Sequence, residues 1–158
     1  MSDQSSLDRI DVIDVVNRMG ILADAREWDA LALCFADEVE VDYTSEFGGE
    51  VQKFTPQALM KDWAWLGNLT GTQHDISSHV VDLDGDRARC RAHVRAVHVS
   101  NGERGEGLWT CWGSYDQQLR RTPSGWKICR TQFSLLGWRG NPEINVIAKS
   151  GKPVLDGK

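Results

Sequence analysis

The stretch Val80-Val81-Asp82-Leu83-Asp84-Gly85-Asp86-Arg87-Ala88 decides the fold of this 158-residue chain. Asp84-Gly85 lies between two runs in which apolar and polar residues alternate. Alternation with a period of two is typical of strands, and an Asp-Gly pair between two such runs is a strong signal for a tight turn. The sequence therefore predicts two antiparallel strands joined at Asp84-Gly85.

Two further turns follow in the same half of the chain. Asn101-Gly102, with the glycines after it, predicts a second hairpin turn, and Pro123-Ser124-Gly125 predicts a third. Residues from about 72 to 138 are therefore expected to form four antiparallel strands joined by three hairpins. Strands of roughly ten to fourteen residues are longer than usual, and long twisted strands curl into a curved sheet.

The first half of the chain has mainly helical patterns. Ser5 or Ser6 can cap the first helix, and Thr55-Pro56 supplies the cap and first residue of the third, which Gly67 ends. The predicted elements are helices at residues 7–26, 28–36 and 55–66 and a strand at residues 38–45.

Helices first and an antiparallel meander second predict one α+β domain over residues 1–158, with its core at about 7–138. The helices are expected to cover the open side of the curved sheet and to enclose a pocket. Residues 140–158 contain two prolines and three glycines and are expected to form a loose tail.

Composition restricts the classes of partner. The net charge of −5 argues against a nucleic-acid partner. No apolar run is long enough to span a bilayer, and the polar segment Met1–Ser6 does not resemble a signal peptide, so a cytoplasmic location is expected. Cys34, Cys90, Cys111 and Cys129 lack Cys-x-x-Cys spacing and are expected to be buried thiols.

Residues 87–99 have two different faces when read as a strand. One face is small and apolar and ends in a histidine: Ala88, Cys90, Ala92, Val94, Ala96 and His98. The other is cationic: Arg87, Arg89, Arg91, His93 and Arg95. The first is predicted to face the interior, where His98 is either a hydrogen-bonded core residue or part of a site. The cationic face is predicted to contact solvent, a neighbouring subunit or acidic side chains.

Gly71-Thr72-Gln73-His74 places a second histidine at the start of a predicted strand, in a chain with four histidines. Asp24 lies near the end of the first predicted helix, where it is either a solvated acid or part of a site. Tyr43 shares a predicted strand face with two valines, so its ring is expected to be buried and its hydroxyl to need a partner. If His74, His98, Asp24 and Tyr43 converge on one cavity, they suffice for proton transfer without a cofactor.

The spacing of the histidines does not indicate a metal site. His74 and His79 are five residues apart, as are His93 and His98, and an odd spacing on a strand points side chains to opposite faces unless a bulge intervenes. The chain also has no helical His-x-x-x-His pair and no phosphate-binding glycine loop. The sequence therefore predicts no metal and no cofactor.

A series of short segments, in order and spacing, resembles the polyketide cyclase (SnoaL-like) group of the nuclear transport factor 2-like superfamily, and most closely the scytalone dehydratases. These segments are Leu22–Asp29, Phe35–Asp37, Val41–Tyr43, Thr72–His74 and Gly125–Ile128. The resemblance covers about residues 7–138. It implies a cone-shaped, strongly curved sheet, antiparallel or mixed, that helices close into a pocket.

The resemblance also implies roles for single residues. His74 would be a catalytic base and Asp24 the carboxylate that fixes its tautomer. Tyr43 would polarise a substrate carbonyl, and His98 falls on the second histidine of the dehydratases. Two positions depart from the pattern, because Ala23 replaces a second tyrosine and Tyr115 falls near an asparagine. The remaining pocket wall is expected to come from the inward residues of the last two strands: Trp109, Cys111, Gly113, Tyr115, Thr131, Phe133 and Leu135.

This resemblance implies a cofactor-independent lyase of the dehydratase type, acting on a small, cyclic, fairly apolar substrate. An isomerase or cyclase of the same fold is an alternative and would use the same base. A non-catalytic ligand-binding or subunit-contact module is a second alternative, and it would not require a titrating Asp24–His74 pair. Relatives of this kind usually form dimers or trimers, so a homodimer or homotrimer is expected.

Overall fold

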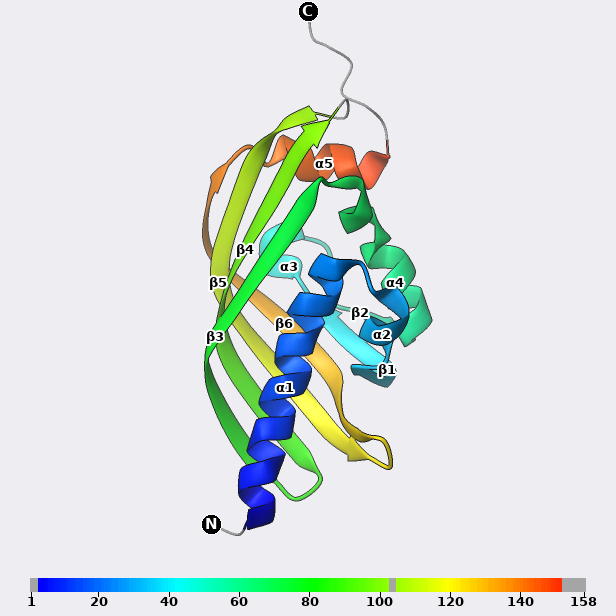
Figure 1. Cartoon of the computed structure of the whole chain (residues 1–158), viewed down its shortest axis with the longest axis vertical. Coiled ribbons are helices and arrows are strands. Elements are labelled where there is room, and N and C mark those ends of the chain that lie inside the picture. The colour runs from blue at the N-terminus through cyan, green and yellow to red at the C-terminus, as the bar shows by residue number, and fades with distance from the viewer. Residues whose placement is uncertain (1–2, 103–104, 152–158) are drawn as a thin grey trace, which may run out of the picture.

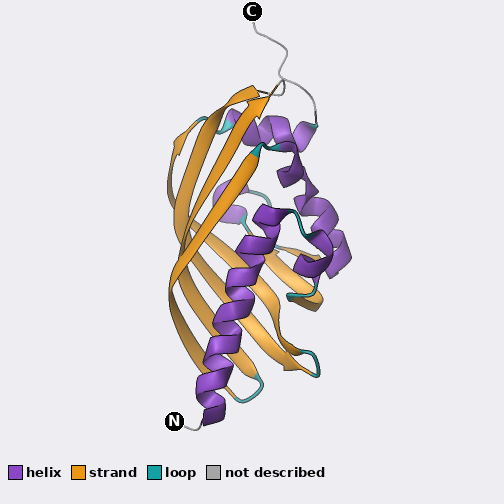
Figure 2. Cartoon of the chain, in the orientation of Figure 1, coloured by secondary structure: helices purple, strands orange, loops and turns teal. Residues whose placement is uncertain are grey.

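The computed structural model describes residues 3–102 and 105–151 and has one curved sheet with helices on its concave side (Figures 1 and 2). The sheet contains six strands in the order β2-β1-β6-β5-β4-β3. The strands are β1 (Phe35–Asp42), β2 (Gln52–Phe54), β3 (Gly71–Asp84), β4 (Arg87–Gly102), β5 (Gly105–Thr122) and β6 (Gly125–Gly140). The helices are α1 (Asp3–Ala25), α2 (Trp28–Ala32), α3 (Thr44–Phe47), α4 (Pro56–Trp63), the 3₁₀ helix η1 (Ala64–Asn68) and α5 (Glu143–Ser150).

The predicted meander of four strands and three hairpins is confirmed. Asp84 pairs with Arg87, which leaves Gly85 and Asp86 as the two turn residues, and Gly85 has a φ of 57°. The turn thus lies one residue later than the predicted Asp84-Gly85, and the positive φ suits glycine, which has no Cβ, at the first turn position. Strand β4 pairs with β5 up to Gly102 and Gly105, and residues 103–104 of that predicted turn lie outside the described residues. These four strands contain 14 to 18 residues, so β3 reaches the upper end of the expected ten to fourteen and the other three exceed it.

Strand β1 is parallel to β6, so the sheet is mixed. The alternation of its residues is as predicted for Val39 and Val41, which are both buried. The strand ends at Asp42, however, and Tyr43 already has the non-helical backbone that begins α3. The prediction that Tyr43 continues the strand is therefore wrong.

Two helix boundaries also differ from the prediction. Ser5 and Ser6 lie inside α1, so neither is its cap. The second helix ends at Ala32, and Phe35 pairs with Ile128 of β6 as the first residue of β1. The strand pairing overrides a helical pattern that is only nine residues long in the sequence. The cap at Thr55 is confirmed, since its hydroxyl accepts a hydrogen bond from the Ala58 N–H.

The expectation of a loose tail over residues 140–158 is wrong for residues 143–150, which form α5. Ile144 and Ala148 are buried one turn apart, and the Ala148 carbonyl accepts a hydrogen bond of 2.8 Å from the Asn68 side chain of η1. Pro142 and Gly151 stand at the two ends of this helix, where both residue types are common. They therefore bound a helix here and do not indicate a loop. Residues 152–158 lie outside the described residues.

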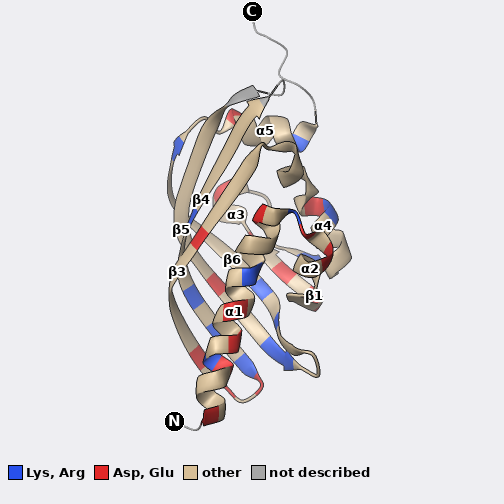
Figure 3. Cartoon of the chain, viewed as in Figure 1, with Lys and Arg blue, Asp and Glu red and all other residues tan. Residues whose placement is uncertain are grey.

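The two faces of β4 behave as predicted. Ala88, Cys90, Ala92, Val94, Ala96 and His98 are all buried. The arginines of the opposite face pair with acids of the neighbouring strands: Arg89 with Asp116, Arg91 with Asp82, and Arg95 with Asp75. Figure 3 shows that the charged residues of the long strands lie mainly on the half of the sheet nearer the N-terminus. No helix of residues 3–102 and 105–151 is long and apolar enough to cross a membrane.

Gly113 permits a close approach of β5 to β6 at an irregularity in their pairing. A Cβ at this position would lie 2.0 Å from the Ser134 carbonyl oxygen, far inside van der Waals contact. Gly113→Ala is therefore expected to lower the free energy of unfolding by about 1–3 kcal/mol, the usual cost of overpacking. Urea denaturation measures this change. Gly71→Ala is the matched control because a Cβ there meets no atom of the described residues within 4 Å. Equal stability of the two variants would contradict the argument.

Candidate active site

A cavity of about 650 Å³ lies between the concave face of the sheet and the covering helices. Its wall is rich in aromatic side chains, which are Tyr43, Phe47, Phe54, Trp63, Trp65, Tyr115 and Phe133. Besides the two tyrosines, its ionisable side chains are Glu46, Lys61, Asp62, His74, His98, Cys111 and Lys149. The cavity therefore offers a largely apolar space with acid and base groups in its wall.

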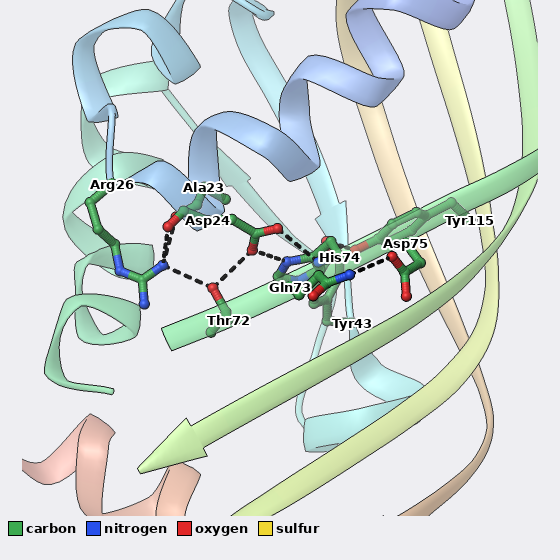
Figure 4. A network of polar contacts seen from close by, with 9 residues as sticks. All are labelled: Ala23, Asp24, Arg26, Tyr43, Thr72, Gln73, His74, Asp75 and Tyr115. Carbon is green, nitrogen blue, oxygen red and sulfur yellow. Dashed lines mark hydrogen bonds and ion pairs between the residues drawn. The ribbon is translucent and has the colours of Figure 1, made fainter. Parts of the chain in front are cut away.

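The predicted contact between Asp24 and His74 is present (Figure 4). Nδ1 of His74 lies 2.7 Å from Oδ1 of Asp24, and the His74 backbone N–H donates to Oδ2 at 2.8 Å. Thr72 adds a third hydrogen bond, from its hydroxyl to Oδ1 at 2.8 Å. Both carboxylate oxygens of Asp24 are thus occupied by residues at the start of β3.

The electrostatics favour an ionised Asp24. Burial raises the pKa of this carboxyl, but its hydrogen bonds with His74 and Thr72 and the charge of His74 outweigh burial, so the pKa is lowered overall. A carboxylate can only accept at Oδ1, so Nδ1 of His74 carries a proton. In the neutral ring, Nε2 then holds the lone pair and can act as a base.

The close packing of α1 on β3 explains how residues so far apart in the sequence meet. Gly20 is buried, and a Cβ there would lie 3.0 Å from the Ile76 side chain and 3.2 Å from Cβ of His74. A glycine at this position lets the helix approach the strand. Asp24 follows four residues later on the same helix face and so reaches the start of β3.

His98 is 5% exposed and lines the cavity. Its ring stacks on Trp65 at a centroid distance of 6.4 Å, and it lies 5.9 Å from His74 and 5.0 Å from Trp109. Its Nδ1 has no hydrogen-bond partner within residues 3–102 and 105–151. Burial, followed by the charge of His74, lowers the pKa of His98 to about 3. His98 is therefore a neutral imidazole at physiological pH.

Tyr43 and Tyr115 bring their hydroxyls together in the wall of the cavity. The Tyr43 hydroxyl donates to the Tyr115 oxygen at 3.4 Å, and both rings contact Phe133. Burial raises the pKa of Tyr43 to about 12 and raises that of Tyr115 well above its ordinary value. Both hydroxyls therefore remain protonated. Tyr43 uses its single hydrogen on Tyr115, so the Tyr115 hydroxyl is the one of the pair that can donate to a ligand oxygen.

The other residues predicted for the pocket fall into two groups. Cys111, Tyr115 and Phe133 line the cavity, as expected. The following residues are absent from its wall: Trp109, Gly113, Thr131 and Leu135. Trp109 is buried beside His98, and Thr131 is fully buried in the core.

Leu135 is excluded because α3 docks on β6 at this point. The Ser45 hydroxyl donates to the Phe133 carbonyl at 2.7 Å and accepts from the Leu135 N–H at 2.9 Å. The wall of the cavity on β6 therefore ends at Phe133. Asp24 also stands outside the wall itself, where it contacts His74 from behind.

The sequence did not predict Glu46 and Lys149 as cavity residues, since they lie on α3 and α5, two helices that the sequence pattern missed. Lys149 lies over the rings of Phe47 and Trp65, with Nζ 4.9 Å from the Trp65 centroid. Burial raises the pKa of Glu46 to about 7, against the opposing effect of the Lys149 charge. Only the amphipathic spacing of Ile144, Ile147 and Ala148 could have indicated α5.

Glu46→Gln is expected to stabilise the protein at high pH only. The pKa of Glu46 is raised in the folded state, so its ionised form opposes folding, and this cost grows as the pH rises from about 4.5 through about 7. Removing the charge should add about 1–2 kcal/mol to the free energy of unfolding near pH 8, because each pKa unit is worth about 1.4 kcal/mol and partial exposure reduces the effect.

Urea denaturation of both proteins near pH 8 and near pH 4 measures this difference. Glu50→Gln, at an exposed position nearby, is the matched control. A gain for Glu46→Gln that is equal at both pH values would disprove the assigned pKa.

A metal site requires several ligands that lie together. Strand β3 has a bulge between Ser77 and Val80, so spacing alone does not separate His74 from His79. Even so, the described parts of the chain contain no group of three or more His, Cys, Asp or Glu side chains that could hold a metal ion. Cys34, Cys90 and Cys111 are buried free thiols, as predicted. Cys129 is a free thiol too, but it is half-buried, so the prediction of burial is wrong for it.

Comparison with known proteins identifies the family to which this curved sheet, with its cavity and its Asp24–His74 pair, belongs. The family model of the SnoaL-like domain matches residues 4–132. The chain belongs to the SnoaL-like domain family. The resemblance read from the short segments is thereby confirmed. The match covers α1, whose last turn carries Asp24, and β3, which carries His74.

Relatives of this SnoaL-like domain are found among both sequences and structures. It is 30% identical over 129 residues to the uncharacterized protein Rv2910c of Mycobacterium tuberculosis (strain ATCC 25618 / H37Rv). This match covers 78% of this chain and 82% of the relative. The structure of the Kfla4162 protein from Kribbella flavida is similar with a TM-score of 0.83 and 27% identity, over 90% of this chain and 99% of that one.

A candidate scytalone dehydratase from Novosphingobium aromaticivorans DSM 12444 has a TM-score of 0.74 and 23% identity, over 88% of this chain and 91% of that one. At this identity the similarity shows the fold alone. The predicted α+β fold with a curved sheet closed by helices is thus confirmed.

Proposed function

We propose that this SnoaL-like domain is a cofactor-independent lyase that removes a carbon-bound proton and then water from a small, cyclic, largely apolar substrate. The observation that carries this proposal is the Asp24–His74 hydrogen bond of 2.7 Å at the wall of an aromatic cavity. A histidine whose Nδ1 is held by a carboxylate has its other nitrogen available as a general base.

In the proposed first step, Nε2 of His74 takes a proton from a carbon next to a substrate carbonyl. The electron pair of the broken C–H bond forms an enolate, and the resulting imidazolium is stabilised by Asp24. Tyr115 has a protonated hydroxyl in the cavity wall and would donate a hydrogen bond to the enolate oxygen, and Tyr43 would support it by donating to the Tyr115 oxygen. Donors aimed at a developing oxyanion are among the strongest contributions to catalysis.

In the proposed second step, the enolate electrons form a carbon–carbon double bond while the bond to the leaving hydroxyl breaks. The proton held by His74 passes to the departing hydroxide, which leaves as water and regenerates the neutral base. His98 is neutral because its pKa is about 3, so it would orient the leaving hydroxyl through a hydrogen bond and would not itself supply the proton.

The shape and lining of the cavity support a cyclic substrate. Aromatic side chains from α3, α4, η1 and the sheet surround the space, which suits the flat faces of a ring. The name of the structural neighbour from Novosphingobium aromaticivorans also refers to a dehydratase, of scytalone. This likeness extends to the fold only, so the argument for the reaction depends on the residues of this chain.

A screen of small cyclic hydroxyketones tests the proposal. Wild-type protein and His74→Ala are incubated in parallel with each compound, and mass spectrometry detects loss of one water. Water loss that requires His74 would support the lyase. An isomerase, which needs the same base and no leaving group, would instead give a product of unchanged mass. Tight binding of a compound with no conversion by either protein would contradict the enzymatic proposal.

A further inference from the structure

We propose that Arg26 and Thr72 form a hydrogen-bond relay that fixes the proton positions of the Asp24–His74 pair. Both would be positioning residues, since they act through Asp24 and neither lines the cavity. The inference rests on the proposed function only in that it takes His74, held by Asp24, to be the catalytic base. The relay itself consists of contacts of the described residues.

The relay is a continuous series of short contacts (Figure 4). Nη1 of Arg26 donates to the Thr72 hydroxyl at 2.8 Å, and that hydroxyl donates to Oδ1 of Asp24 at 2.8 Å. Oδ1 then meets Nδ1 of His74 at 2.7 Å. The series therefore connects the end of α1 to the base on β3 in three steps.

The chemistry of the donors sets the direction of each bond. A guanidinium has only N–H donors, so the Thr72 oxygen accepts from Arg26. A hydroxyl has a single hydrogen, which must then point to Asp24. Oδ1 accepts this hydrogen and accepts from Nδ1 of His74 as well. Each contact of the relay therefore has one donor and one acceptor only when Nδ1 of His74 carries the proton.

The backbone of Arg26 supports a role for its side chain. Arg26 has a φ of 62°, in the left-handed region that favours glycine, and directly follows α1. Its N–H bonds the Ala23 carbonyl at 3.2 Å, and the Glu27 N–H bonds the Leu22 carbonyl at 3.0 Å, which is the hydrogen-bond pattern of a Schellman motif. Glycine is the usual residue at this position, so an arginine there needs a compensating contact of its side chain.

That contact comes from the same nitrogen that starts the relay. Nη1 of Arg26 also lies 3.0 Å from the Ala23 carbonyl and 2.8 Å from the Asp24 carbonyl, so one of its two hydrogens is shared between two of its three acceptors. The guanidinium thereby ties the last turn of α1 to Thr72 on β3. The helix end that carries Asp24 and the strand that carries His74 are held at a fixed separation.

The charged and titratable groups that act on this carboxyl come from three elements. Arg26 follows α1, His74 is on β3 and His98 is on β4. Thr72 contributes no charge, so its effect on Asp24 is a hydrogen bond alone. Substitution of Thr72 therefore tests the relay without altering the net charge of the site.

The test is a carbon-13 NMR titration of the Asp24 carboxyl, which needs no substrate. Thr72→Val keeps the shape of the side chain and removes the hydroxyl, and Thr72→Ser keeps the hydroxyl. Arg26→Gly removes the guanidinium and suits the left-handed backbone. We expect the titration midpoint of Asp24 to rise by about half a pH unit or more in Thr72→Val and in Arg26→Gly, and to stay unchanged in Thr72→Ser.

Thermal melting separates this effect from a loss of folding. Thr72→Val and Arg26→Gly should melt close to the wild-type temperature, because both residues suit their backbone conformations. With an identified substrate, both variants should lose about tenfold in kcat with little change in KM, since a misplaced catalytic group costs up to about 100-fold. Thr72→Ser should restore the rate.

The two proposals fail in different ways. An Asp24 midpoint in Thr72→Val that equals that of wild type and of Thr72→Ser would overturn the relay, whatever the activity of His74→Ala. A raised midpoint together with full activity of His74→Ala would support the relay and overturn the proposed function.

Discussion

His74→Ala is expected to lower kcat at least about 100-fold on a substrate that the wild-type protein converts, because general-base catalysis contributes about 10²–10⁴-fold. Among residues 3–102 and 105–151, His74 is the only histidine that both contacts a carboxylate and lines the cavity, and the variant lacks it. Single-turnover kinetics with wild type and variant measures the effect. Substrate affinity should change much less, because the aromatic wall of the cavity stays intact.

Two further variants define this result. Asp24→Asn should lose a comparable factor, since an amide keeps the shape of the carboxylate but cannot stabilise the imidazolium. His93→Ala should retain full activity, because His93 is exposed on the opposite face of β4. Full activity of both His74→Ala and Asp24→Asn would remove the proposed mechanism.

Replacement of His98 is expected to separate proton abstraction from water loss. Dehydration should fall about 100-fold in His98→Ala and in His98→Phe, on the scale of losing one donor to a developing oxyanion. Exchange of the carbon-bound proton with solvent requires only His74 and should continue. Deuterium incorporation measured beside product formation tests both statements.

His98→Phe is the sharper of the two variants. Phenylalanine keeps a ring among Trp65, Trp109 and His74, so it limits the cavity that alanine would leave. Loss of exchange in His98→Phe, with the Asp24–His74 contact preserved, would mean that the roles of the two histidines are wrongly assigned. Unchanged dehydration would mean that His98 has no role in the departure of the leaving group.

The features that the sequence predicted best depend on local rules. Gly85 and Gly125 take positive φ values in tight hairpins, so turn chemistry alone located two of the three turns. The interior position of His98 followed from the alternation of small apolar residues on one strand. The pairing of Asp24 with His74, by contrast, required the family resemblance, because 50 residues separate them.

The features that the sequence did not predict depend on contacts made across the fold. Helix α3 has four residues and is held by the bonds of Ser45 to β6, which no local pattern reveals. Consequently the position of Tyr43 was misjudged and Glu46 was overlooked. Arg26 was missed as well, since its backbone has a left-handed conformation that is usual for glycine and that an arginine in the sequence does not indicate.

The parallel pairing of β1 with β6 sets an order for folding. Strands β3 to β6 are joined by short turns and can pair as soon as each hairpin has been synthesised. Strand β1 cannot pair with β6 until Ile128 and the residues after it have been synthesised, although β1 itself is synthesised long before them. A nascent chain therefore carries β1 with one unpaired edge until β6 emerges from the ribosome. We expect this edge to be the main site of misfolding and chaperone binding during synthesis.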